Sequence, residues 1–249
     1  NVTGAPSGSS APALRDSWAA QNMVPLSSLI TDSYDIYATF PVKDMASLKN
    51  KRINAPGTSA NWLRETGATP VDGALTTYYT NIQTGVTEGA LSFASGIGPA
   101  RVYEVAKHLT RVDIGSMYFG SVAVNKKFFD GLPKEVQAAM LKAGKATSLA
   151  HGKHVTRTAD AALETMKKAG LQISNLPEAE KAKWVSSLPN IVGPWLQTNG
   201  EQGKAVLNKV GSALKKNEEH IIRVEGHTDN VPLSGRGLYK SNWELSAAR

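Results

Sequence analysis

Residues 52–63, RINAPGTSANWL, combine a short strand pattern, a Pro-Gly turn and a helix start. Thr58 or Ser59 can cap this helix, which we expect to run to about Glu65 and to end at Gly67. A strand that turns into a helix in this way leaves backbone N–H groups pointing outward, and such groups favour anions. The segment therefore indicates an anion-binding turn or, in the simpler interpretation, only a capped helix.

Three polar residues near the C-terminus, Asp229, Asn242 and Arg249, have a spacing suited to a zwitterionic ligand. A carboxylate accepts hydrogen bonds from an ammonium group, and a forked guanidinium binds a carboxylate. If Asn242 caps a helix, Arg249 lies on the same helical face. The alternative is that Asp229 is a turn residue and Arg249 a surface residue. His227 and Asp229 have no third ligand nearby in the sequence, so we expect no metal site.

Catalytic motifs are missing from the sequence. We find no Gly-x-Ser-x-Gly, His-Glu-x-x-His or phosphate-loop pattern, and residues 57–61 lack the final Gly of a nucleophile elbow. The chain has no Cys, which excludes disulfides, thiolate metal sites and cysteine nucleophiles. We therefore predict a binding protein that is not an enzyme and uses no cofactor.

The composition of the 249 residues is that of a folded chain, with 41% apolar residues. The net charge of +7 comes from basic residues scattered along helical stretches, whereas a nucleic-acid binder concentrates them on one face. We therefore expect no nucleic-acid partner. No apolar run approaches the roughly 20 residues of a membrane span. The first residue is Asn and no signal peptide is visible, so we expect a processed or internal start.

Short strands alternate with short helices along the first half of the chain, which predicts an α/β unit with a largely parallel sheet. The expected strands are 33–40, 51–55, 68–71, 88–93 and 113–125, and the expected helices are 14–21, 58–65, 76–84 and 101–106.

Residues 133–170 carry apolar side chains at spacings of three to five and are bounded by Pro133 and Gly170. This pattern predicts one long helix or two joined helices, an element able to connect two lobes. A helix at 178–188 and an amphipathic helix at 205–216 follow. A change of pattern near residues 200–203 divides the chain into predicted domains 1–202 and 203–249.

Three sequence blocks, GATPV at 67–71, QTGVTEG at 83–89 and LPKEVQ at 132–137, resemble the solute receptors of TRAP transporters (DctP type) in order and spacing. The resemblance covers roughly residues 33–195. It implies an α/β, periplasmic-binding-protein-like fold whose two lobes are joined by a long hinge helix. A small organic solute, usually a carboxylate, would be trapped between the lobes in the periplasm and passed to the membrane permease subunits.

The resemblance also has two departures. The family places an Arg two residues before the Pro that ends the strand, and this sequence has Asn54 there, with Arg52 two residues earlier. Asn carries no charge, so a neutral, aromatic or differently anchored solute becomes an alternative to a dicarboxylate. The family also has a long segment before the equivalent of residue 30, so we expect the first lobe to be partial.

Near the cleft, flat apolar walls and orienting polar groups are expected from aromatic, Asn, Gln and Glu side chains. For each aromatic residue ordinary core packing is the alternative, and Glu88 could instead stabilise the hinge or a helix start. The predicted ligand-binding residues are Asn54, Tyr78, Gln83, Glu88, Phe93 and Phe119.

The motif from Thr228-Asp229 to Asn242-x-x-Leu245-Ser246-x-x-Arg249 resembles the OmpA-like peptidoglycan-binding domain. That resemblance implies that Asp229, Asn242 and Arg249 bind the peptide stem of peptidoglycan and that the module anchors the chain to the cell wall. The family continues beyond the equivalent of Arg249, so we expect a partial α+β module at 203–249 joined to the solute-binding domain, as in a chimera.

Overall fold

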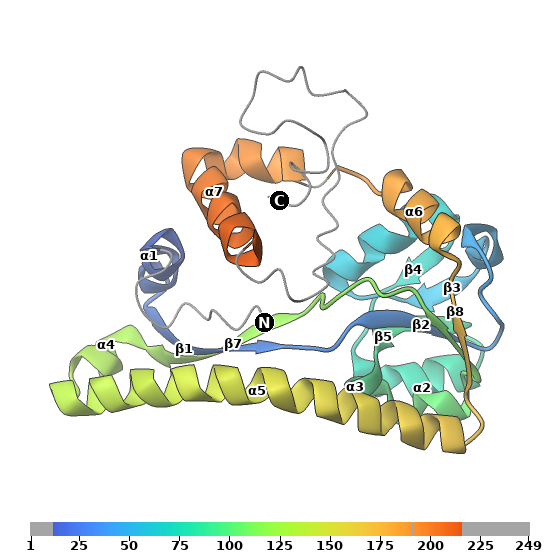
Figure 1. Ribbon diagram of the computed structural model, residues 1–249, viewed down its shortest axis with the longest axis horizontal. Coiled ribbons are helices and arrows are strands. Elements are labelled where there is room, and N and C mark those ends of the chain that lie inside the picture. The colour runs from blue at the N-terminus through green and yellow to red at the C-terminus, as the bar shows by residue number, and fades with distance from the viewer. Residues whose placement is uncertain (1–11, 191, 216–249) are drawn as a thin grey trace. The chain divides into compact units, whose positions relative to one another are not determined.

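The computed structural model describes residues 12–190 and 192–215, which form two compact units (Figure 1). Unit 2 comprises Ile30–Tyr118 and Lys153–Leu188, and the remaining described residues belong to unit 1. Helix α5, Lys134–Lys168, contributes residues to both units. It is a single helix of 35 residues, which confirms the long helix predicted at 133–170.

Unit 2 is built on a six-stranded sheet with the strand order β4-β3-β5-β2-β6-β8. Strand β2 is antiparallel to both neighbours, and the other three pairs are parallel. The sheet is therefore mixed, and the prediction of a largely parallel sheet missed the reversed strand. The strands are β2 (Tyr34–Ala38), β3 (Arg52–Asn54), β4 (Thr69–Val71), β5 (Gly89–Phe93), β6 (His108–Arg111) and β8 (Gln172–Asn175).

Helices cover both faces of this sheet, and successive side chains along a strand point alternately into the two resulting core layers. Ile36 and its face pack with Leu63 of η2 (Gly57–Thr66) and Trp184 of α6 (Glu178–Ser187). Tyr37 and the opposite face pack with α2 (Leu75–Gln83), α3 (Ala94–Ile97) and the C-terminal part of α5, as Figure 1 shows. The short helices η1 (Met45–Leu48) and η3 (Val102–Glu104) complete the two layers.

Unit 1 contains a two-stranded sheet of β1 (Met23–Ile30) and β7 (Phe119–Asn125). Strand β1 lies on α5, where the backbone N–H of Ser28 donates to Ser148 Oγ at 2.9 Å. The approach is so close that a Cβ atom on Gly144 would lie 2.1 Å from the carbonyl oxygen of Leu26. The other helices are α1 (Pro12–Ala20), α4 (Lys126–Asp130) and α7 (Val192–Lys215).

The structure corrects three expectations about local structure. Thr58 and Ser59 do not cap the helix that follows β3, since Pro56 is the N-cap residue and the Ser59 hydroxyl donates to its carbonyl oxygen at 2.6 Å. The strand expected at 113–125 begins only at Phe119, because Asp113 and Gly115 have positive φ angles of 54° and 92°. Strands β1, β6 and β8 were not predicted.

The predicted domain boundary between residues 202 and 203 lies within α7, shortly after Gly200. Gly200 has φ 51° and ψ −138°, so the helix is kinked there. The sequence also predicts a strand at 220–224 and a helix that starts at Asn242, and both lie outside the described residues.

Candidate functional site

The carboxyl ends of the parallel strands lie along one side of the unit 2 sheet, perpendicular to the strands, and ligands of open α/β sheets bind beyond this side. Because β2 runs in the opposite direction, its first residue lies at this same edge and pairs in register with the last residue of β5. We call this the carboxyl edge. The strands end on this side at Asn54, Val71, Phe93, Arg111 and Asn175, and β2 begins there at Tyr34. Strand β3 stops short of β5, since Asn54 pairs with Ala90.

Three aromatic side chains lie at the carboxyl edge. The rings of Tyr34 and Phe93 are 5.2 Å apart between centroids, and the Phe93 ring lies so close to Gly96 that a Cβ atom there would be 2.6 Å from it. Tyr78 of α2 is 2% exposed, yet its hydroxyl makes no hydrogen bond to any described residue. Burial raises the pKa of the Tyr78 phenol far above its usual range, and Tyr34 and Asp72 add to the rise. The hydroxyl is not one of the fully buried oxygens that lack a partner, so it is the part of Tyr78 that reaches the surface, and we consider it a candidate ligand donor.

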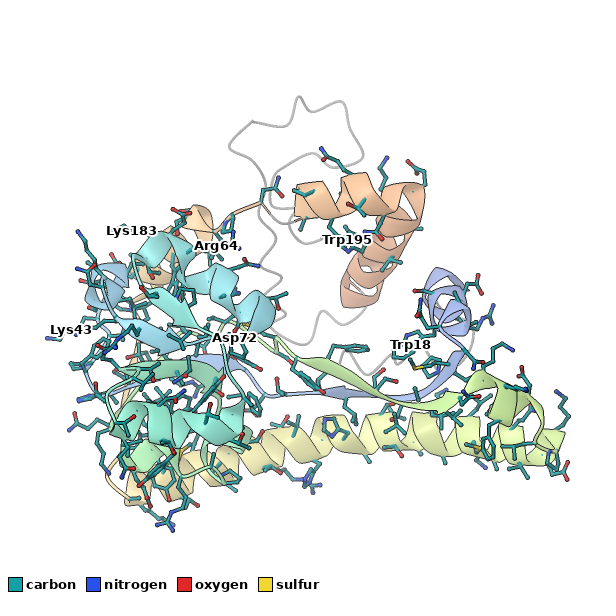
Figure 2. All side chains as sticks on the ribbon, turned by 180° about the vertical axis from the view of Figure 1, so that it is seen from behind. Trp18, Lys43, Arg64, Asp72, Lys183 and Trp195 are labelled. Atoms are coloured by element: carbon teal, nitrogen blue, oxygen red, sulfur yellow. The ribbon has the colours of Figure 1, made fainter. Side chains whose placement is uncertain are left out.

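Two carboxylates flank these rings. Asp32, two residues before β2, accepts hydrogen bonds from Ala94 N at 2.8 Å and from the Ser95 hydroxyl at 2.5 Å. It thereby fixes the turn that follows β5. Asp72 follows β4 and is exposed; Figure 2 shows it at the opposite end of unit 2 from Lys43. We call the side chains Asp32, Tyr34, Asp72, Tyr78 and Phe93 the acidic aromatic rim.

Arg111, at the end of β6, is bound to two carboxylates. Its Nε atom lies 2.7 Å from Asp35 Oδ2, and its Nη2 atom lies 3.1 Å from Asp113 Oδ1. Asp35 also accepts backbone hydrogen bonds from Val112 at 2.8 Å and Asp113 at 2.9 Å, and Lys181 binds Asp113 at 2.7 Å. Burial raises the pKa of the Asp35 carboxyl to about 6, although Arg111 opposes the rise. The charges of this network are therefore largely matched within the protein.

Asn54, predicted as a ligand contact, has no exposed surface, and its amide is bound within the protein. Its Nδ2 atom donates to Thr87 Oγ1 at 2.7 Å and to the Gly89 carbonyl at 3.0 Å, and its Oδ1 atom accepts from Asn81 Nδ2 at 3.1 Å. Asn54 therefore joins β3, α2 and the segment before β5. Its contact with a ligand stays a prediction, and its observed contacts are those of a positioning residue.

Gln83 and Glu88, also predicted as ligand contacts, lie at the other edge of the sheet. Gln83 is the exposed last residue of α2, and Glu88 precedes β5. Glu88 accepts a hydrogen bond from Arg52 N at 2.8 Å and pairs with the Arg52 guanidinium at 3.3 Å, which also donates to the Gly85 carbonyl at 2.8 Å. The structure thus brings Tyr78 and Phe93 to one edge and these two residues to the other.

The remaining predicted residues lie outside unit 2. Phe119 is the first residue of β7 in unit 1 and is 63% exposed. Asp229, Asn242 and Arg249 lie outside the described residues. Within the described part of the chain, no three His, Asp or Glu side chains form a metal-binding group. No described helix has the length and apolar character needed to cross a membrane.

The sequence interpretation missed Asp32, Tyr34 and Asp72. Each stands at the end of a strand that was predicted, so the local signal was present. What the sequence did not reveal is the reversed direction of β2, which brings Asp32 and Tyr34 to the carboxyl edge.

The sequence profile of the bacterial extracellular solute-binding proteins, family 7 (DctP), matches residues 4–196. The C4-dicarboxylate-binding periplasmic protein DctP of Rhodobacter capsulatus is 35% identical over 120 residues, which cover 47% of this chain and 35% of that protein. The ectoine-binding periplasmic protein TeaA of Halomonas elongata is 24% identical over 184 residues, which cover 72% of this chain and 54% of that protein. The chain thus spans about a third to a half of the length of these relatives.

Among solved structures, the Bordetella pertussis extracytoplasmic solute receptor DctP6, which binds pyroglutamic acid, superposes with a TM-score of 0.73 at 24% identity. The superposition covers 80% of this chain and 66% of that one. At this identity the likeness establishes the α/β, periplasmic-binding-protein-like fold.

Proposed function

The chain belongs to the bacterial extracellular solute-binding proteins of family 7, and from this premise we propose that it binds a small organic solute in the periplasm and delivers it to the permease subunits of a TRAP transporter. The family consists of binding proteins and not of enzymes, in agreement with the missing catalytic motifs. Relatives are named for binding a C4-dicarboxylate, ectoine or pyroglutamic acid, so a small carboxylate-type solute is the class to test first.

The observation that carries the proposal for this chain is Tyr78 at the carboxyl edge, whose ring is buried while its hydroxyl reaches the surface without a hydrogen-bond partner in the described chain. This hydroxyl can donate to a ligand, and the rings of Tyr34 and Phe93 supply flat apolar surface at the same edge. A small solute could accept a hydrogen bond from Tyr78 and lie against these rings. We therefore assign Tyr34, Tyr78 and Phe93 to the proposed site.

Thermal unfolding of the full chain in the presence of pyroglutamate, ectoine or succinate tests the proposal. A solute that binds the folded state raises the unfolding free energy by RT ln(1 + [L]/Kd), about 2.7 kcal/mol at a hundredfold excess over Kd. Titration calorimetry then gives the affinity of each solute that stabilises the chain. If no small organic solute of any charge stabilises the chain, the proposal is wrong.

Two neighbouring tyrosines on α2 offer a matched pair of variants. Tyr78→Phe removes the unpaired hydroxyl and should weaken solute binding about tenfold. Tyr79→Phe removes a hydroxyl that bonds to Glu104 at 3.5 Å and should leave the affinity unchanged. Equal effects of both variants would remove Tyr78 from the site.

A second proposed activity, peptidoglycan binding through Asp229, Asn242 and Arg249, is supported by the OmpA-like motif of the sequence. Sedimentation of the chain with purified sacculi, compared with Arg249→Ala, tests it. The proposal requires that the chain co-sediments and that the substitution abolishes this. Sedimentation that Arg249→Ala leaves intact would contradict the role of the motif.

A further inference from the structure

The charged groups that act on the two phenols of the acidic aromatic rim are all negative. Burial raises the pKa of Tyr34, and the carboxylate of Asp32 adds to the rise. Burial likewise raises the pKa of Tyr78, and the carboxylate of Asp72 adds to that rise. No Lys or Arg of the described chain lowers the pKa of either phenol. The charged side chains of the rim itself are two carboxylates, Asp32 beside the start of β2 and Asp72 after the end of β4.

The cation at the same edge, Arg111, does not change this. Its guanidinium contacts Asp35 at 2.7 Å and Asp113 at 3.1 Å, and its charge acts on Tyr37 on the α5 side of the sheet. The two carboxylates, Asp35 and Asp113, are balanced by the two cations Arg111 and Lys181. Arg111 therefore has no unmatched positive charge to attract an anionic ligand.

We propose that the acidic aromatic rim binds the positively charged group of a small cationic or zwitterionic solute, such as a quaternary ammonium or an amidinium group. This inference rests on the proposed function and names the charge class of its solute. Cations bind over the faces of aromatic rings, and Phe93 is the partly exposed ring here, packed at 5.2 Å between centroids on the buried ring of Tyr34. Asp32 and Asp72 supply the opposite charge, while the Tyr78 hydroxyl can donate to an oxygen of the solute.

An anionic group at the same place would meet the carboxylates of Asp32 and Asp72, whereas Arg111 at this edge already pairs with Asp35 and Asp113. The Asn54 amide cannot replace a cation, because it is neutral and its donors bind Thr87 and Gly89. A solute with a carboxylate can still bind if its positive group occupies the rim. The inference thus separates zwitterions and cations from solutes that carry only negative charge.

Glycine betaine and 3,3-dimethylbutanoate test the inference, because they have nearly the same shape and carboxylate and differ in a central nitrogen cation or carbon atom. Titration calorimetry on the full chain should give at least about tenfold tighter binding of the compound with the cation. Ectoine should likewise bind more tightly than pyroglutamate. The same ranking should hold in thermal unfolding.

Asp72→Asn removes one exposed carboxylate of the rim, and Asp160→Asn makes the same charge change on an exposed residue of α5. We expect Asp72→Asn to weaken betaine or ectoine about threefold to tenfold and to leave 3,3-dimethylbutanoate equal or tighter. Asp160→Asn should change neither.

The possible outcomes separate the inference from the proposed function. The inference is overturned if pyroglutamate binds more tightly than ectoine, if 3,3-dimethylbutanoate binds more tightly than glycine betaine, or if succinate binds more tightly than both zwitterions. The proposed solute-binding function would remain in each of these cases. Equal loss in Asp72→Asn and Asp160→Asn also overturns the inference. If no solute of either class binds, the proposed function fails and the inference fails with it.

Discussion

Replacing Asn54 by Leu tests whether this residue holds the fold or contacts the solute. The Asn54 amide makes three hydrogen bonds, to Thr87, Gly89 and Asn81, at a position with no exposed surface. Each such bond contributes about 1 kcal/mol net, and a buried partner left without a bond costs more. The apolar surface of Leu offsets part of this loss. We therefore expect Asn54→Leu to lower the free energy of unfolding by about 3 kcal/mol.

Urea unfolding without any solute measures this difference directly. Thr87→Val is the matched partial change, since it removes one of the three bonds and should cost about 1 kcal/mol. The double variant should lose less than the sum of the two, because both changes remove the same bond. If Asn54→Leu is as stable as the wild-type chain but no longer binds solute, the positioning role is refuted and Asn54 is a ligand contact.

Three further changes test the fold and its charges. Gly144→Ala should destabilise the chain by about 1–3 kcal/mol in urea unfolding, because the new methyl group would lie 2.1 Å from the backbone oxygen of Leu26. Trp184→Phe should cost about 2 kcal/mol in the same assay, since it removes the 2.7 Å bond from the indole N–H to the Trp62 carbonyl and leaves a void. Burial raises the pKa of Asp35 from 3.8 to about 6, so between these pH values the folded chain holds a proton that the unfolded chain has released. The unfolding free energy of the wild type relative to Asp35→Asn should therefore fall by about 3 kcal/mol from pH 3.5 to 7; a difference that rises with pH would contradict the shift.

The elements that could be predicted from the sequence have strong local signals. The apolar stripe between Pro133 and Gly170 predicted α5, and the β-branched and aromatic run at 33–40 predicted β2. Strand β8 has no such signal, since its four residues, QISN, are all exposed at the edge of the sheet. It forms a strand because it pairs with β6, and pairing between residues this distant in sequence leaves no periodic pattern.

The candidate site was harder to predict than the fold because strand direction decides which residues meet. Tyr78 and Phe93 were predicted and lie at the carboxyl edge, whereas Glu88 was predicted on the same grounds and lies at the opposite one. Glu88 directly precedes β5 and Phe93 is its last residue, so the two side chains are separated by the full length of the strand although they are close in sequence. Asp32 stands next to a predicted strand, but its place at the carboxyl edge could not be predicted because it depends on the reversal of β2.

The family relationship and the rim support different expectations for the charge of the solute, and they depend on different residues. The fold depends on buried core positions such as Ile36, Leu91 and Trp184, and such a core is compatible with many ligands. The charge that the site prefers depends on the few side chains at its edge. At the position where the family resemblance leads us to expect an Arg, this chain has Asn54, whose neutral amide is bound within the protein, so Asn54 adds no positive charge beside the carboxylates of the rim. For the solute's charge, the local chemistry of the rim is therefore the stronger guide.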